Sequence, residues 1–343
     1  MTDIDKLVRN NVRNLAPYSS ARDEFSGKDG IFLDANENPY GNLNRYPDPY
    51  QRELKSAISK IKGIPEEKIF LGNGSDEVID LCFRIFCNPG TDKALTFSPT
   101  YGMYEVSAAV NDIKIIKVPL TDSFQIDMPV VLPLLDDETL KLIFICSPNN
   151  PTGNCFNRAD IEKIISTFHG IVVIDEAYID FTEKPSFTPL TSAYSNLIVM
   201  QTLSKAMGLA AIRIGMAITN TGIIKYFNKI KPPYNVSTVN QRAALKMLET
   251  KGENKRQINL IIHERNRLST KLLDLKITKK VFPTDANFIL VEVTDATGIY
   301  NSLVDKNIIV RNRTSVVNNC LRITVGKPLE NNALVSALNS FEQ

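Results

Sequence analysis

The alternation of short apolar runs with longer segments of helical period limits the possible folds more than any other feature of this sequence. Runs rich in Val, Ile and Phe lie at 93–98, 113–120, 140–147, 170–176 and 196–202. The segments between them place apolar residues three and four positions apart, as amphipathic helices do. Continuous apolar strands that alternate with helices are typical of a mostly parallel sheet that is covered on both faces. We therefore expect an α/β fold for most of the chain.

The pattern changes after about residue 235. Long polar helical segments follow, and then three strands that alternate apolar and polar residues. This change predicts three units: an N-terminal helix with an extended arm over 1–45, a large α/β domain over 46–235, and a smaller α+β domain over 236–343. The stretch 15–50, which contains most of the arm and continues into the start of the large domain, is rich in Pro, Asn and Tyr and has little periodicity, so we expect extended chain that packs on the rest or on a neighbour.

Composition argues against several classes of protein. The 343 residues contain 40 Lys and Arg against 38 Asp and Glu, so the chain lacks the basic excess that nucleic-acid binding requires. Five scattered cysteines and two histidines predict neither a disulfide framework nor a metal site. No run of eighteen apolar residues and no signal peptide is recognisable, so we expect a cytoplasmic protein that does not enter the membrane.

Ligands of open α/β sheets bind beyond the carboxyl ends of the strands, so residues at those ends are the candidates for a site. The stretch "GNGSDE" at 72–77 places Gly74, Ser75 and Asp76 at the start of a helical pattern. The free amides of a helix N-terminus suit a phosphate. The same residues also fit an ordinary helix cap made by Ser75, and the motif alone does not decide between the two.

Two further strand ends carry polar residues. "SPNNPTG" at 147–153 presents Asn150 on a loop set by prolines, although turn chemistry alone would also explain it. "DEAY" at 175–178 ends a strand that should be buried, and the carboxylate of Asp175 then needs a partner. A cationic ligand would serve, with Tyr178 nearby, and an internal salt bridge is the alternative.

"TLSKAMGLAAIRIG" at 202–215 holds one lysine and one arginine in apolar surroundings. Taken alone, Lys205 and Arg213 fit surface side chains whose stems cover apolar neighbours. Beside the other strand ends, a lysine of depressed pKa suits a Schiff base with an aldehyde, and Asp175 suits a pyridinium nitrogen. Arg213 suits a phosphate, together with the hydroxyls of Thr202 and Ser204. These are the needs of pyridoxal 5'-phosphate.

These motifs, in this order, resemble the fold-type I pyridoxal-phosphate aminotransferases. "LDANENPYG" at 33–41, "RYPDP" at 45–49, "SPTYGMYE" at 98–105 and "CLRITVG" at 320–326 are similar to the histidinol-phosphate aminotransferase subgroup. The resemblance extends from about residue 12 to residue 330. It implies a large domain with a mostly parallel sheet, a smaller α+β domain at the carboxyl end, and an N-terminal arm that packs on the small domain and on a dimer partner.

The resemblance implies a role for each matching residue. Lys205 would form the Schiff base and move the proton between the substrate's Cα and the C4′ of the cofactor. Asp175 would pair with the pyridinium nitrogen, Asn150 and Tyr178 would bond the ring's O3′, and Tyr101 would stack on the ring. The phosphate would be held by residues of three segments: Gly74, Ser75, Asp76, Thr202, Ser204 and Arg213.

Other implied roles concern the dimer and the substrate. Tyr46 would reach the cofactor phosphate of the partner subunit in an obligate homodimer. Arg322 would bind the anionic group of the substrate, and Tyr18 and Asn36 would line the pocket. Arg311 is a candidate second phosphate contact, although a surface arginine after an edge strand fits its position equally well.

The implied reaction is reversible transfer of an amino group from L-glutamate to imidazole-acetol phosphate, which gives L-histidinol phosphate and 2-oxoglutarate. Two enzymes of the same fold remain open as alternatives, an aromatic amino-acid aminotransferase and a threonine-phosphate decarboxylase. A regulator or scaffold without chemistry is disfavoured, because Lys205, Asp175 and Arg213 are all present.

Overall fold

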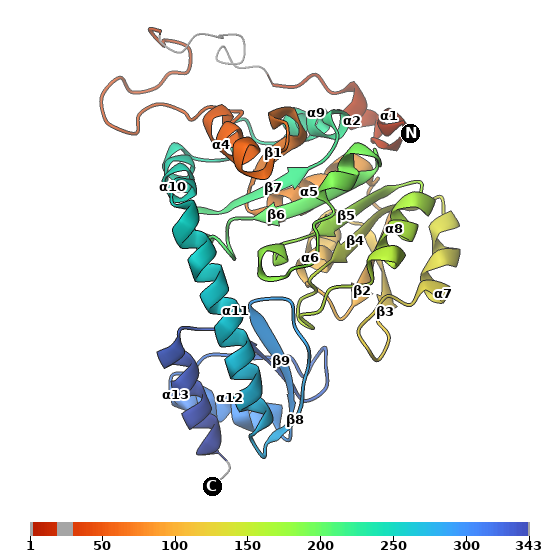
Figure 1. The fold of residues 1–343 in the computed structure, drawn as a ribbon. Coiled ribbons are helices and arrows are strands. Elements are labelled where there is room, and N and C mark those ends of the chain that lie inside the picture. The colour runs from red at the N-terminus through yellow and green to blue at the C-terminus, as the bar shows by residue number, and fades with distance from the viewer. Residues whose placement is uncertain (1–2, 19–29, 342–343) are drawn as a thin grey trace.

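The structure is a computed structural model that describes residues 3–18 and 30–341. Its larger part is built on a seven-stranded sheet in the order β1-β7-β6-β5-β4-β2-β3 (Figure 1). Neighbouring strands among β2 to β6 are parallel, whereas β7 is antiparallel to both β1 and β6. The strands are β1 (Ile69–Asn73), β2 (Lys93–Ser98), β3 (Lys114–Pro119), β4 (Leu140–Cys146), β5 (Ile171–Asp175), β6 (Leu197–Thr202) and β7 (Ile214–Ile218).

Helices cover both faces of this sheet, because successive side chains of its strands point to opposite sides. In β4, Phe144 joins a core cluster with residues of α5 and α9, and Ile143 joins a second cluster with residues of α8. The helices of this part are α1 (Ile4–Leu7), α2 (Asn10–Asn14), α4 (Arg52–Lys62), α5 (Ser75–Phe86), α6 (Met103–Val110), α7 (Met128–Val131), α8 (Arg158–Thr167), α9 (Thr221–Ile230) and α10 (Thr238–Leu248).

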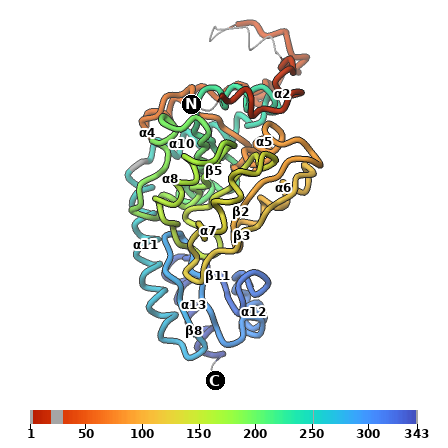
Figure 2. The backbone as a smooth tube through the Cα atoms, turned by 90° about the vertical axis from the view of Figure 1, so that its right-hand side faces the viewer, coloured from red at the N-terminus to blue at the C-terminus, as the bar shows by residue number. Residues whose placement is uncertain are grey.

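The smaller part has its own core around an antiparallel sheet of order β10-β11-β9-β8. The long helix α11 (Lys251–Leu273) runs from the larger part into the smaller one (Figures 1 and 2). The other elements are β8 (Thr278–Val281), β9 (Phe288–Val293), α12 (Ala296–Asp305), β10 (Arg311–Asn312), β11 (Cys320–Thr324) and α13 (Pro328–Asn339). The expected α/β fold with a smaller α+β part is confirmed.

Some local expectations differ from the structure. The predicted N-terminal helix is two short helices, α1 and α2, and both contact α9 of the larger part instead of the small part. The strands β1, β7 and β8 are not among the apolar runs from which strands were predicted. The predicted boundary at residue 235 stays a prediction, since α10 still packs against α4.

The described residues of the stretch 15–50, which are 15–18 and 30–50, form neither a helix nor a strand, in keeping with the expected extended chain. Residues 19–29 of the same predicted arm lie outside the described residues. The arm's course after residue 30 brings it alongside α4 and α10 at one end of the larger part (Figure 1).

Candidate active site

A cavity of about 190 Å³ lies where β4, β5 and β6 end, which is the place that the parallel sheet predicts for a ligand. Two of its lining residues, Cys146 and Ala177, had no role in the sequence-based prediction. The others are predicted site residues that the fold brings together: Ser75, Asp76, Tyr101, Asn150, Asp175, Tyr178, Thr202, Ser204, Lys205, Arg213 and Arg322.

The N-terminus of α5 forms one wall of this cavity. Gly74 occupies the cap position with a φ of 77°, in the left-handed region that favours glycine, and no side chain caps the helix. The alternative interpretation, a cap made by Ser75, is therefore wrong. A Cβ on Gly215 would lie 2.2 Å from the backbone nitrogen of Ser75, so β7 and the start of α5 are in direct backbone contact. The first amides of α5 thus remain available for an anion.

Arg213 lies beside these amides, and its guanidinium contacts Asp76, Ser204 and Gly74. Its φ is 50°, and its Nη2 is 3.2 Å from the Oδ2 of Asp76. Its Nη1 donates to the Oγ of Ser204 over 3.5 Å, and a Cβ on Gly74 would come within 2.6 Å of Nη2. Asp76 also accepts a hydrogen bond of 3.2 Å from the Tyr101 hydroxyl. Because a carboxylate repels phosphate, we propose that Asp76 positions Arg213 and Tyr101 instead of contacting the phosphate.

Asp175 is only 3% exposed at the end of β5. Its Oδ1 accepts a hydrogen bond of 3.0 Å from the backbone amide of Ala177, and its Oδ2 accepts one of 2.7 Å from the hydroxyl of Tyr104. Burial raises the pKa of the Asp175 carboxyl, and the bond from Tyr104 opposes this rise. No internal salt bridge involves Asp175 among the described residues, so that alternative is not supported.

Lys205 follows β6 and lines the cavity together with Asp175. Its side chain is more exposed than the sequence-based interpretation assumed, because it faces the open cavity. Its pKa is still lowered, chiefly by the protein atoms that surround it and then by the positive charge of Arg322. Its Nζ lies 5.6 Å from the centre of the Tyr178 ring. A lysine of lowered pKa holds more of the neutral amine that attacks an aldehyde.

Asn150 links the two parts of the molecule across the cavity. It donates through Nδ2 to the Tyr178 hydroxyl over 3.3 Å, and it accepts at Oδ1 from the Nη1 of Arg322 over 2.6 Å. Asn150 and Tyr178 are both buried, and Arg322 comes from β11 of the smaller part. The pKa of the Tyr178 hydroxyl is raised, mainly by burial. The cavity is thus closed on one side by the small domain.

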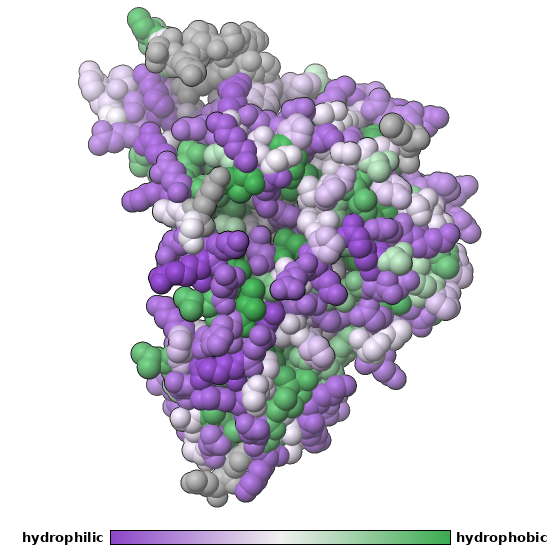
Figure 3. Space-filling model, viewed as in Figure 1, coloured by the Kyte–Doolittle hydropathy of each residue, from purple (hydrophilic) through white to green (hydrophobic). Residues whose placement is uncertain are grey.

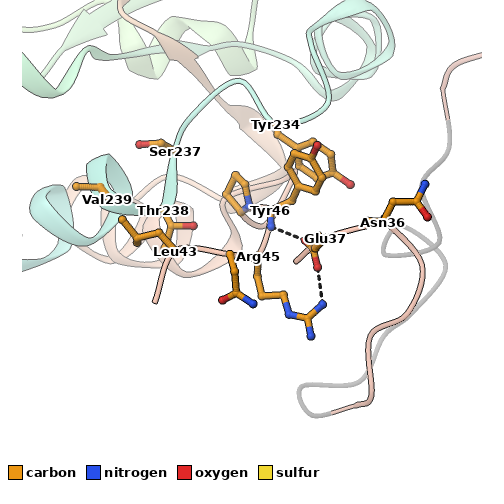
Figure 4. Close-up of a pocket in the computed structure, with 12 residues that line it drawn as sticks. Asn36, Glu37, Leu43, Arg45, Tyr46, Tyr234, Ser237, Thr238 and Val239 are labelled. Atoms are coloured by element: carbon orange, nitrogen blue, oxygen red, sulfur yellow. Dashed lines mark hydrogen bonds and ion pairs between the residues drawn. The ribbon is translucent and has the colours of Figure 1, made fainter. Parts of the chain in front are cut away.

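Apart from Gly74, which precedes α5, four predicted site residues do not line this cavity. Tyr46 and Asn36 line a separate one of about 490 Å³ between the arm and the start of α10, where Tyr46 stacks on Tyr234 with ring centres 4.5 Å apart (Figure 4). Tyr18 is 71% exposed. Arg311 is exposed on β10, where it lies opposite Arg322 in the strand register. The roles of these four residues remain predictions.

Within residues 3–18 and 30–341, three or more His, Cys, Asp or Glu side chains nowhere gather as metal ligands would. In the same ranges, no helix has both the length and the apolar character needed to cross a membrane.

Comparison with known proteins identifies the family. The family described as aminotransferase class I and II matches residues 31–338. The chain belongs to this family. A histidinol-phosphate aminotransferase of Parabacteroides distasonis is 52% identical over 345 residues, which cover 100% of both chains.

Solved structures agree with the fold. The histidinol-phosphate aminotransferase from Clostridium acetobutylicum is 27% identical, with a TM-score of 0.81 over 88% of this chain and 91% of that chain. The enzyme from Sinorhizobium meliloti, solved in complex with pyridoxal-5'-phosphate, is 24% identical, with a TM-score of 0.79 over 89% of each chain. The protein is therefore a fold-type I aminotransferase that depends on pyridoxal phosphate.

The side chains of the cavity fit this cofactor. The uncapped amides of α5, with Arg213 and Ser204 beside them, offer only donors and one cation to a phosphate. Asp175 offers a buried carboxylate to the ring nitrogen, and Lys205 offers an amine of lowered pKa to the aldehyde. A Cβ at Gly74 would clash with the Arg213 guanidinium and one at Gly215 with the backbone at the start of α5, so both glycines allow these groups to pack closely around the α5 N-terminus. We propose that these residues hold the cofactor in the roles that the resemblance implied.

Bound pyridoxal phosphate supplies an aldehyde for amino groups and a ring that withdraws electrons from the carbon that loses its proton. The chain's own residues do the rest. Asp175 would keep the ring nitrogen protonated, and Lys205 would carry the proton to and from the substrate carbon. Asn150 and Tyr178 would hold the ring hydroxyl in place, and Arg322 would orient the substrate through its anionic group.

Proposed function

We propose that this aminotransferase transfers an amino group between L-glutamate and imidazole-acetol phosphate, giving L-histidinol phosphate and 2-oxoglutarate in histidine biosynthesis. A histidinol-phosphate aminotransferase that is 52% identical over the full length supports the proposal. A set of three arginines favours a phosphate-bearing substrate in particular. They are Arg311 on β10, Arg313 directly after β10, and Arg322 on β11.

Three arginines gather on one face of the small sheet. Arg311 lies directly opposite Arg322 in the register of β10 and β11. Arg313 is two residues after Arg311, and its backbone amide bonds the carbonyl of Cys320, which continues the ladder. Residues two apart in a strand share a face, so the three side chains lie together.

Among the described residues, none of the three arginines forms an ion pair with a carboxylate. The pKa of Arg313 is lowered by burial and then by the positive charges of Arg322 and Arg311. The Nε atoms of Arg313 and Arg322 are buried and have no hydrogen-bond partner among the described residues. Like charges placed opposite each other in a sheet repel, which is unfavourable. An anion bound here relieves this repulsion and is attracted by all three arginines.

A phosphate group uses this arrangement better than a carboxylate does, because it carries nearly two charges and more acceptor oxygens. Glutamate must bind the same Arg322 with a single carboxylate. Aromatic amino acids bring no charge on their side chains to the arginine set, which disfavours the aromatic aminotransferase. Threonine phosphate does bring a phosphate, so the decarboxylase is separated only by experiment.

The experiment is a set of half-reactions with the cofactor-loaded enzyme. L-histidinol phosphate, L-phenylalanine, L-tyrosine and L-threonine phosphate are added separately, and the absorption of the lysine-bound cofactor is followed as it is lost. We expect L-histidinol phosphate to react fastest, with no carbon dioxide released from threonine phosphate. A faster reaction of an aromatic amino acid, or release of carbon dioxide, would overturn the substrate assignment.

We also propose that the enzyme is a cytoplasmic homodimer. The arm exposes large apolar side chains, namely Ile31, Leu33, Tyr40 and Leu43, which are 92%, 90%, 83% and 66% exposed in the single chain. Elsewhere, on the face drawn in Figure 3, hydrophilic residues predominate and hydrophobic ones appear in small groups. Tyr46 lies on the same arm, away from its own subunit's cavity. A partner that covers this arm would bury these residues and bring Tyr46 to the partner's cofactor phosphate.

Mixed dimers test the homodimer. Subunits that carry Lys205→Ala and subunits that carry Tyr46→Phe are refolded together and compared with each parent. One site of a mixed dimer then has its own Lys205 and receives an intact Tyr46 from the other subunit. Activity above the sum of the parents supports the exchange of Tyr46, and a monomeric enzyme in sedimentation would contradict it.

A further inference from the structure

Tyr104, which lies outside the set predicted from sequence, makes the closest side-chain contact with Asp175. Its hydroxyl donates to Oδ2 of Asp175 over 2.7 Å. The side chain is fully buried. Its ring stacks on Phe144 with centres 4.9 Å apart and meets Tyr101 edge to face at 5.6 Å. Packed on these sides, the ring has little freedom, so the hydroxyl is held on the carboxylate.

The surroundings of Asp175 otherwise favour its protonated form. Burial and the negative charge of Asp76 on α5 both act in this direction, whereas the charge of Lys205 after β6 acts against it. Cys146 of β4 lies beside Tyr104, with the pKa of its thiol raised by burial and by Asp175. The remaining titratable groups that face Asp175 are Tyr101 and Tyr178.

Only two hydrogen bonds to the Asp175 carboxylate are present among the described residues, one from Tyr104 and one from the backbone amide of Ala177. The hydrogen bond from the Ala177 amide depends on the turn after β5, so any residue with a carboxylate at position 175 could accept it. The bond from Tyr104 depends on one side chain that comes from a different element, α6. Tyr104 is therefore the side chain that supplies a hydrogen bond to this carboxylate among the described residues.

We propose that Tyr104 is a positioning residue that keeps the shared proton on the ring nitrogen of the cofactor and off Asp175. Two bases, the ring nitrogen and the carboxylate, compete for this one proton. A hydrogen bond donated to the ionised carboxylate stabilises that form and lowers its affinity for the proton. The carboxylate still has unused lone pairs for the ring nitrogen, since its two oxygens offer about four in all.

Loss of the hydroxyl then moves the proton toward Asp175 and weakens the ring as an acceptor of electrons. This inference rests on the cofactor of the family and is independent of the substrate proposed above. Tyr104 acts through Asp175, so it has no direct contact with the substrate to lose.

The test uses pyridoxal phosphate labelled with ¹⁵N in the ring, bound to the whole enzyme without substrate. The chemical shift of the ring nitrogen reports how far it is protonated. In Tyr104→Phe we expect the shift to move toward that of an unprotonated pyridine. Thr96→Val is the matched control, because it also removes a fully buried hydroxyl next to Phe144, and it should leave the shift as in the wild type.

A pair of variants separates an effect through Asp175 from a general disturbance of the site. In Asp175→Asn the ring nitrogen has already lost its carboxylate, so adding Tyr104→Phe should change the shift no further. Tyr104→Met also fills the buried space without a hydroxyl, and it must move the shift in the same direction as Tyr104→Phe. With L-glutamate we expect Tyr104→Phe to lower kcat about tenfold and to leave KM nearly unchanged.

A ring-nitrogen shift in Tyr104→Phe that equals the wild-type value overturns the inference. So does a change in the Asp175→Asn background as large as the change in the wild type. The nuclear magnetic resonance experiment contains no substrate, so an error in the substrate assignment cannot alter its result.

Discussion

Replacing Gly215 by Ala should damage the phosphate end of the site through backbone contact alone. An ideal Cβ at this position would lie 2.2 Å from the nitrogen and 2.6 Å from the Cα of Ser75, and 2.5 Å from the carbonyl carbon of Gly74. Carbon atoms rest about 3.5–4.0 Å apart, so the overlap exceeds about 1 Å. The atoms in the way are backbone atoms at the start of α5, so β7 and the start of α5 must move apart.

The expected magnitude follows from this overlap. Overpacking of a tight core costs about 1–3 kcal/mol, and backbone neighbours place this variant at the upper end. For a domain of this size, 1 kcal/mol corresponds to roughly 2–4 °C in Tm, so we expect Tm to fall by roughly 5–10 °C. If the Ser75 amide also loses its bond to the phosphate, about 1.5–3 kcal/mol of binding is lost. That loss raises the Kd for pyridoxal phosphate about 10-fold to 100-fold.

Two assays measure these effects. Thermal unfolding of the cofactor-free protein gives Tm, and titration of its absorbance with pyridoxal phosphate gives Kd. Gly252→Ala is the control, because nothing lies within 4 Å of a Cβ at this helical position. It should keep or slightly raise Tm, since alanine favours a helix more than glycine does. If Gly215→Ala matches the wild type in both assays, the close contact between β7 and α5 does not shape the site.

Three further predictions concern charge and hydrogen bonding. Arg313→Leu should raise KM for L-histidinol phosphate about tenfold and change KM for L-glutamate less, and equal changes in steady-state kinetics would speak against the arginine set as a phosphate site. Glu176→Gln should lower the free energy of unfolding by about 1–3 kcal/mol, measured in urea, with the cofactor spectrum unchanged. The Glu176 carboxylate accepts hydrogen bonds from the Ser186 hydroxyl, the Phe187 amide and the Gln201 side-chain amide, at 2.6, 2.6 and 2.8 Å. If the variant unfolds at the same urea concentrations as the wild type, these hydrogen bonds do not stabilise the fold. Arg322→Gln should raise the pKa of Lys205, because the positive charge of Arg322 lowers it. An amine reagent added to the cofactor-free protein should then modify Lys205 at a higher pH than in the wild type. Modification at an unchanged or lower pH would refute the coupling between the two residues.

The sequence predicts the main side chains of the site because its strands are easy to locate. Lys205, Asp175 and Asn150 each follow an apolar run, and the ends of parallel strands must meet at one edge of the sheet. The same reasoning does not find Tyr104. It sits on the apolar face of a helix, where a tyrosine is expected as part of the core, and only the structure shows its hydroxyl on Asp175.

Other parts of the site depend on contacts that the sequence pattern does not encode. The role of Arg313 depends on the register of two short strands, which sets Arg311 opposite Arg322. The exposure of Lys205 depends on the shape of the cavity. Tyr46, Tyr18 and Asn36 belong to a stretch without periodicity, so only the resemblance assigned them to the site. The role proposed for Tyr46 also requires a second chain.

A complete cycle of both half-reactions tests the proposed function most directly. L-histidinol phosphate is added to the cofactor-loaded enzyme, and 2-oxoglutarate is added after the spectrum has changed. We expect the first addition to remove the absorption of the lysine-bound cofactor and to release one equivalent of imidazole-acetol phosphate. The second should restore the absorption and release one equivalent of L-glutamate. An unchanged spectrum with L-histidinol phosphate, or a spectrum that 2-oxoglutarate does not restore, would contradict the proposed reaction.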